Sequence, residues 1–220
     1  MIELPDFSKP FEYENNFYFS SGIGRIGKLI AHYELFKMVK DLPGEIIECG
    51  VFKGSSLIRF VTFRNLFEKG NLRKVVGFDA FGKFPETNFE EDKVMRQKFI
   101  DDSGEEGIDV EQLYDILDRK KIRTNVELIK GNVCKTVPEY VLKNPDLKIS
   151  LLNIDTDIYE PAKVILEKLW PKIVKGGVLI LDDYGVFPGE TKAVDEYFKG
   201  QNIEIKKFDY SATPRYVIKK

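Results

Sequence analysis

Short apolar runs that stop at a glycine or an acidic residue alternate with helical patterns along most of this 220-residue chain. The runs are rich in Val, Ile and Leu and predict strands over 45–49, 74–78, 126–129, 148–154 and 177–181. Apolar residues three and four positions apart predict helices over 26–39, 54–66, 161–174 and 191–198. This alternation predicts an α/β fold with a mostly parallel, doubly wound sheet.

The last part of the chain has a different pattern. Residues 203–208 and 215–218 are short strand candidates separated by the segment DYSATP. We expect them to form a hairpin-like antiparallel pair that closes the parallel sheet.

The length of the chain fits a single domain over residues 1–220. Residues 1–22 are polar and aromatic, and we expect them to form an arm or lid. A charged insert, residues 84–110, follows the second predicted strand. Its acidic runs are typical of a solvated surface, and its position also allows it to cap a site.

Composition excludes several classes of function. The chain has 34 basic and 36 acidic residues and a net charge of −2, which gives no electrostatic reason to expect a nucleic-acid partner. No apolar run approaches the length of a membrane span and the first residues lack the apolar region of a signal peptide, so we expect a cytoplasmic protein. Cys49 and Cys134 have no metal-site spacing and cannot form a disulfide framework.

Acidic residues stand where the predicted strands end: Glu48, Asp79, Asp155 with Asp157, and Asp182 with Asp183. The carboxyl ends of parallel strands share one edge of the sheet, so these side chains are expected to meet there. Asp155 and Asp157 would face the same side if the extended backbone continues between them. Carboxylates this close repel one another and favour a cation, a hydroxyl-bearing ligand or both.

Two glycine-rich segments could bind a nucleotide. GIGRIG, residues 22–27, matches the GxGxxG pattern of dinucleotide-binding proteins, but that motif needs a buried strand directly before it. The preceding NNFYFSS is poorly apolar, so a structural loop is the favoured interpretation and an NAD-dependent oxidoreductase is the alternative.

The second segment runs from Glu48 to Ser56 and follows a compact β-branched strand. Gly50 and Gly54 let the backbone approach a ligand where a side chain would block it, and the serines suit a helix start. Asp79 at the next strand end can accept both hydroxyls of a ribose. A tight turn with a surface aspartate is the structural alternative.

The segments GEIIECGVFKGSS, VVGFDAFGKFPE, LLNIDTDIYEPAKVILEKLWPKIVKGGVLILDDYG and KAVDEYF occur in this order over residues 44–198. The chain thereby resembles the small S-adenosylmethionine-dependent O-methyltransferases, and more narrowly the TylF/MycF (macrocin O-methyltransferase) family of antibiotic-sugar methyltransferases. The resemblance implies a Rossmann-like class I methyltransferase fold, S-adenosylmethionine as cofactor and a divalent metal, usually Mg²⁺.

The resemblance also assigns roles to individual residues. The cofactor-binding set would be Glu48, Gly50, Gly54, Ser56, Asp79, Gly131 and Asn132, running from the methionine part through the ribose to the adenine. The metal ligands would be Asp155, Asp182 and Asp183. Asp157 would be the general base or a further ligand, and the sequence does not divide these roles between Asp155 and Asp157. His32, the sole histidine, is expected to be a packing or surface residue rather than a catalyst.

The leading hypothesis is therefore methyl transfer to a hydroxyl of a sugar or another small polar molecule. The metal would position and acidify the hydroxyl, and a carboxylate would take its proton. The family suggests a glycosylated natural product or a nucleotide-linked sugar as substrate, and a homo-oligomer is possible. A non-enzymatic binding module on the same fold is a further alternative.

Overall fold

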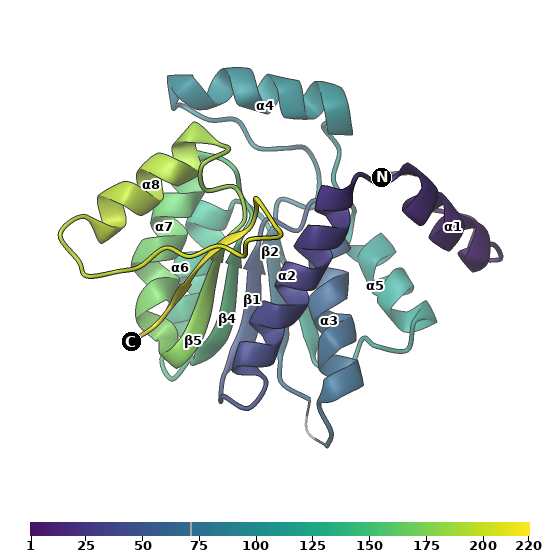
Figure 1. The fold of residues 1–220 in the computed structure, drawn as a ribbon, viewed down its shortest axis with the longest axis horizontal. Coiled ribbons are helices and arrows are strands. Elements are labelled where there is room, and N and C mark those ends of the chain that lie inside the picture. The colour runs from purple at the N-terminus through teal and green to yellow at the C-terminus, as the bar shows by residue number, and fades with distance from the viewer. Residues whose placement is uncertain (71) are drawn as a thin grey trace.

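A single six-stranded sheet organises the protein, as shown by a computed structural model that describes residues 1–70 and 72–220 (Figure 1). The strands lie in the order β3-β2-β1-β4-β5-β6. All neighbouring pairs are parallel except β5 and β6, which are antiparallel. The strands are β1 (Glu45–Cys49), β2 (Val75–Asp79), β3 (Val126–Lys130), β4 (Ile149–Ile154), β5 (Ile173–Leu181) and β6 (Arg215–Ile218). The predicted α/β class and the antiparallel C-terminal strand are confirmed.

Helices cover both faces of this sheet and bury its apolar side chains in two core clusters. The helices are α1 (Pro10–Ser20), α2 (Ile23–Val39), α3 (Ser55–Phe67), α4 (Glu90–Ser103), α5 (Val110–Arg119), α6 (Val133–Lys143), α7 (Tyr159–Leu169) and α8 (Pro188–Phe198). Side chains of α2, α3 and α5 pack in one cluster, and those of α6, α7 and α8 pack in the other. α4 lies across the edge at which the parallel strands end (Figure 1).

Two predicted elements differ from the observed ones. The predicted helix over 161–174 ends at Leu169, and Pro171 lies in a 3₁₀ turn that precedes β5. Proline lacks the N–H that a continuing α-helix needs, which explains the early end. Residues 203–208 form no ladder with β6 and pair with it at one bridge, Lys206 with Tyr216. Ile203 and Ile205 instead pack against the core as side chains of an irregular segment.

The first glycine-rich segment lies in a helix rather than after a strand, so its interpretation as a structural loop is wrong for residues 23–27. Ile23 begins α2, and the element before it is the helix α1. The strand that would aim a dinucleotide-binding helix at a pyrophosphate is therefore missing from the described part of the chain before residue 23.

The strands β1 and β4 form the centre of the sheet and determine where a ligand can bind. All six residues of β4 are buried. The connection from β1 leads to β2 on one side, whereas β4 connects to β5 on the other side. In open α/β sheets such a reversal leaves a crevice at the carboxyl ends of the two strands.

Gly50 is needed at this crevice because two chain segments approach closely. It has φ of +92°, and a Cβ atom here would lie 1.8 Å from the carbonyl oxygen of Asp155. The glycine therefore allows the loop after β1 to contact the loop after β4 directly.

Within the described residues, no helix is both long enough and apolar enough to cross a membrane.

A matched pair of glycine substitutions tests whether the backbone requires glycine at position 50 but not at position 24. Gly50→Ala should lower the free energy of unfolding by at least about 2 kcal/mol, because it combines a positive φ with a backbone clash. Gly24→Ala places its Cβ in open space within α2 and should be neutral or stabilising by up to ~1 kcal/mol. Urea unfolding measures both. Equal effects of the two substitutions would contradict the assignment.

Candidate active site

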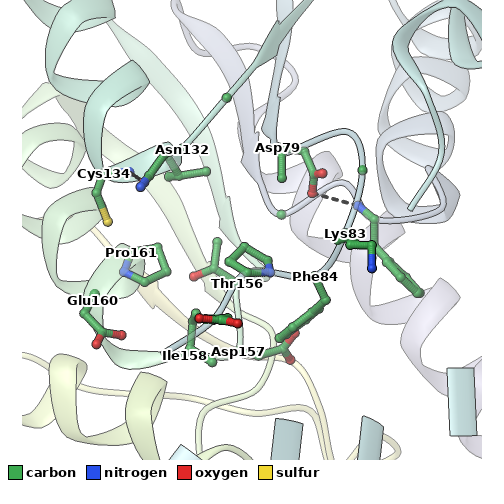
Figure 2. A pocket seen from close by; sticks show the side chains of 18 of the residues that line it. Asp79, Lys83, Phe84, Asn132, Cys134, Thr156, Asp157, Ile158, Glu160 and Pro161 are labelled. Atoms are coloured by element: carbon green, nitrogen blue, oxygen red, sulfur yellow. Dashed lines mark hydrogen bonds between the residues drawn. The ribbon is translucent and has the colours of Figure 1, made fainter. Parts of the chain in front are cut away.

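A cavity of about 530 Å³ opens at the carboxyl ends of the strands. Its size is within the range of pockets that bind small molecules and cofactors. Figure 2 shows Asp79, Asn132 and Asp157 around it, each from a different strand end. Of the sequence-predicted site residues, those that line it are Gly50, Asp79, Gly131, Asn132, Asp155 and Asp157.

The carboxylate of Asp79 organises one side of this cavity. Its Oδ2 accepts hydrogen bonds from the backbone N–H groups of Val51 at 2.8 Å and Phe52 at 3.0 Å. Its Oδ1 accepts from the N–H of Phe81 at 2.6 Å. A carboxylate has about four lone-pair positions and three are used here, so Asp79 keeps about one position for a hydroxyl group of a ligand.

A further part of the cavity wall is built at the end of β3, next to Asp79. Gly131 donates its N–H to the carbonyl oxygen of Asp79 at 2.9 Å, which holds the two strand ends together. Asn132 caps α6, because its Oδ1 accepts from the N–H of Cys134 at 2.9 Å. Both residues thus have a structural reason for their place on the cavity wall.

Glu48, Gly54 and Ser56 lie outside the lining of the cavity. Glu48 is fully buried and accepts from the Ser56 hydroxyl at 2.8 Å and from Asn153 Nδ2 at 3.3 Å. Burial raises the pKa of Glu48 to about 8. The carboxyl group therefore ties the start of α3 to β1 and β4, and contact of these three residues with a cofactor stays a prediction.

Three aspartates form a compact acidic group at the ends of β4 and β5. One carboxylate oxygen from each of Asp155, Asp157 and Asp183 lies within 4.8 Å of the other two. Asp157 has φ of +63°, so the extended backbone does not continue from Asp155, although the two side chains still meet. A non-glycine residue held in this region marks local strain, which is typical of functional sites.

The electrostatics of this group favour a bound cation. Burial raises the pKa of Asp157, and the charge of Asp155 raises it further; burial and the charge of Asp157 do the same to Asp183. Among the described residues, no donor reaches the buried Oδ2 of Asp183. Mg²⁺ and Ca²⁺ prefer oxygen ligands of this kind, so these three side chains fit a divalent metal.

Asp182 is almost completely buried next to this group, but it faces α2. Its Oδ2 is ion-paired with the ammonium of Lys28, and its Oδ1 lies 3.4 Å from Nε2 of His32. Burial alone would raise the pKa of Asp182, but Lys28 and His32 together lower it below its usual value. His32 is fully buried and stacks on Phe60 at 5.0 Å.

Lys28 is a cation that lies against the acidic residues in this structure. Burial disfavours its charge, yet Asp182, Asp155 and Asp183 raise its pKa above the usual value. The predicted metal ligands Asp155, Asp182 and Asp183 are therefore close together, but Asp182 is engaged by α2. Whether a metal binds there stays a prediction.

Sequence analysis missed Glu190, a further acid at this site. It is fully buried in the first turn of α8, where Oε1 accepts from the N–H of Asp183 at 3.2 Å. Its own N–H donates to the carbonyl oxygen of Asp157 at 3.2 Å. Glu190 thus links the two loops that carry the aspartates. The only sequence signal for Glu190 was its place in the first turn of a helix. Acidic residues are common there in many helices, so the signal did not indicate a site.

Comparisons with known proteins relate most of the chain to one family. A family model described as macrocin O-methyltransferase (TylF) matches residues 21–214. Demethyldecarbamoylnovobiocin O-methyltransferase of Streptomyces niveus is 30% identical over 166 residues, or 71% of this chain and 59% of that protein. Mycinamicin III 3''-O-methyltransferase of Micromonospora griseorubida is 26% identical over 71% of this chain and 61% of that protein. The chain spans about three fifths of the length of these curated relatives.

Solved structures show the same fold. CalS11, described as a calicheamicin methyltransferase, superposes with a TM-score of 0.78 at 26% identity, over 99% of this chain and 94% of that one. The O-methyltransferase NovP superposes with a TM-score of 0.75 at 23% identity, over 87% of this chain and 79% of that one. The predicted class I methyltransferase architecture is thereby confirmed.

Replacing Lys28 tests whether the acidic group needs a cation. Lys28→Met should lower the free energy of unfolding by about 3–5 kcal/mol in metal-free buffer, because the buried Asp182 loses its counter-charge. Excess Mg²⁺ should then raise the melting temperature more than it does for the unmodified protein. Lys37→Met, an exposed position on the same helix, is the control. A Lys28 variant as stable as the control would contradict the role of the ion pair.

The buried Glu48 gives stability a specific pH dependence. Because its folded-state pKa is raised to about 8 from the reference value of 4.5, the folded protein keeps a proton that the unfolded chain has lost. The free energy of unfolding should therefore fall as pH rises through this window. Glu48→Gln should reduce that fall, measured by urea unfolding across the window. Identical pH profiles of this variant and the parent would sink the prediction; the exposed Glu91→Gln is the control.

Proposed function

The chain belongs to the macrocin O-methyltransferase (TylF) family, and on that premise we propose that it methylates a sugar hydroxyl with S-adenosylmethionine as donor. The resemblance seen in the sequence motifs is confirmed at the level of the family. The S. niveus relative and CalS11 carry methyltransferase names, and a second structure of CalS11 is described as a TDP-rhamnose 3'-O-methyltransferase. A hydroxyl on a sugar or a comparably small polar molecule is the acceptor class that we infer for this chain.

The proposal rests on one observation. The acidic group borders the cavity, and the cavity is also lined by Asp79 and by Gly50 in the loop after β1. Asp155 and Asp157 belong to the group and also line the cavity. A donor that lies along Gly50, Asp79 and Asn132 would present its methyl group toward those carboxylates. The presence of the acidic group at the cavity wall supports a donor site next to it.

The chemistry requires an acceptor oxygen to lose its proton as it attacks the methyl carbon. The O–CH₃ bond forms as the S–CH₃ bond breaks, and the sulfonium becomes a neutral thioether. We assign the hydroxyl proton to Asp157 or Asp155, since both carboxylates lie at the cavity and burial raises the pKa of each. Holding donor and acceptor in line contributes to the rate in addition to proton transfer.

A divalent metal, when bound, would acidify the acceptor hydroxyl and fix its direction. The residues proposed to hold it are Asp155 and Asp183 together with Asp157 or Asp182. The orphaned Oδ2 of Asp183 and the mutual approach of three carboxylates support this proposal. Asp182 would join the ligands if Lys28 releases it.

The alternative functions have less support. An NAD-dependent oxidoreductase would need GIGRIG after a strand, whereas it lies at the start of α2 and follows α1. A binding module without activity would have no use for buried acids next to a donor-sized cavity. Turnover of a labelled methyl group distinguishes it from an enzyme.

Donor binding is the first test of the proposal. S-adenosylmethionine and S-adenosylhomocysteine should each raise the melting temperature, because a ligand that binds the folded state alone stabilises it. NAD should have no such effect. A protein that neither methyl-donor compound stabilises would contradict the proposed function.

Removal of the metal is the second test. Chelation should abolish transfer of a labelled methyl group to sugar acceptors while the donor-dependent thermal shift remains. Asp183→Asn should behave like the chelated enzyme and lose about 100-fold or more in kcat. Asp146→Asn, an exposed aspartate elsewhere, should match the parent. Full activity in metal-free buffer would rule out the metal.

A further inference from the structure

The insert, residues 84–110, contains a buried aspartate that packing does not explain. Asp92 is completely buried, and within the fully described helix α4 it is the only buried residue. Of the other α4 side chains, Phe99 packs against the rings of Phe52, Phe84 and Phe187, and the rest are exposed or partly exposed. Burying a carboxyl group costs free energy unless hydrogen bonds compensate it, so Asp92 is expected to accept hydrogen bonds from its neighbours.

Asp92 caps two helices that belong to another part of the chain. Its Oδ2 accepts from the N–H of Tyr159, the first residue of α7, at 2.9 Å. Its Oδ1 accepts from the N–H of Gly189, in the first turn of α8, at 2.7 Å. Neither helix has a side-chain cap from its own N-cap residue in the described structure. Helix N-termini have unpaired N–H groups and a partial positive charge, so one carboxylate pairs with an N–H group at each of the two ends.

The sequence makes room for this carboxylate at Gly189. A Cβ atom at this position would lie 1.9 Å from Oδ2 of Asp92 and 2.5 Å from the backbone nitrogen of Tyr159. The backbone φ of Gly189 lies outside the left-handed region, so close approach is the reason for glycine here. Gly189 is therefore an independent sign that the chain is built around the Asp92 carboxylate.

The two capped helices directly follow the loops that carry the acidic group. Asp157 lies two residues before the start of α7, and Asp183 lies five residues before the start of α8. Fixing both helix starts to one carboxylate fixes the separation of these two loops. Glu190 makes a second link between the same loops.

A second contact joins the insert to α7, and here the insert donates the hydrogen bonds and α7 accepts them. Glu160, in the first turn of α7, accepts from the Thr87 hydroxyl at 2.9 Å and from the N–H of Asn88 at 2.8 Å. Glu160 and Asn88 also line the cavity. The insert is thus bound to the acid-bearing loops at two points and forms part of the wall around the ligand.

We propose that Asp92 is a positioning residue that holds the metal-binding carboxylates in register and couples the docking of the insert to cation binding. This inference rests on the proposed function, because it needs the acidic group to bind a divalent cation. Asp92 acts through the helix starts and does not itself contact the reacting atoms.

The test compares Asp92→Asn with Asp102→Asn, the same substitution at an exposed position of α4. Calorimetric titration with MgCl₂ should give a dissociation constant about 10–100-fold higher for Asp92→Asn, the range found when groups that orient metal ligands are removed. Hydrogen exchange should show lost protection at the amides of Tyr159 and Gly189. Excess Mg²⁺ should restore kcat of this variant, which a general loss of folding would not allow.

Gly189→Ala provides a second, independent variant that retains the Asp92 carboxyl group. Its added methyl should displace this carboxyl group and weaken Mg²⁺ binding in the same direction. Folded Asp92→Asn protein that binds Mg²⁺ within about twofold of Asp102→Asn would overturn the inference and leave the proposed function standing. A parent protein that binds no divalent cation would overturn this inference and the proposed metal, whereas only a failure to bind the methyl donor would overturn the proposed methyl transfer.

Discussion

Mutual repulsion among buried carboxyl groups is the constraint on which the rest of the site depends. Asp155, Asp157, Asp182, Asp183 and Glu190 approach one another at the ends of β4 and β5, and burial raises the pKa of four of them. Such an arrangement is costly in a folded protein unless positive charge or protons compensate it. Lys28 supplies an ammonium to Asp182, the acid of these five whose pKa is lowered.

Residues from distant parts of the chain contact the strand-end acids or the helices that follow their loops. α2 contributes Lys28 and His32 to Asp182, and the insert contributes Asp92 to the helices that follow the acidic loops. α2 and the insert therefore do more than cover the sheet. Each contributes a charged group that the strand-end acids or their loops require.

The strands of the sheet could be predicted from the sequence because each one corresponds to a short run of neighbouring residues. Each β-branched run ends at a glycine or an acid, so the strand ends and the candidate residues from Glu48 to Asp183 could be located before the structure was known. The same locality explains the false strand at 203–208, whose alternating pattern is present without a partner ladder. GIGRIG matches a nucleotide-binding motif, but the poorly apolar segment before it disfavoured that role in the sequence.

The partners of the acids could not be predicted from the sequence. Asp92 lies in a charged run that is typical of a surface, and only the packing of α4 on two helix starts makes it buried. Lys28 is one of many lysines, and its pairing with Asp182 depends on where α2 crosses the sheet. Long-range placement of this kind leaves no periodic signal in a single sequence.

The central claim is that the strand-end acids form a cation site next to the methyl-donor cavity. A crystal grown with S-adenosylhomocysteine and Mn²⁺ tests it most directly, because anomalous scattering locates Mn²⁺ unambiguously. We expect a peak bounded by carboxylate oxygens of Asp155 and Asp183, beside the sulfur of the bound product. Product in the cavity with no Mn²⁺ at these aspartates, and with Lys28 still paired to Asp182, would contradict the claim.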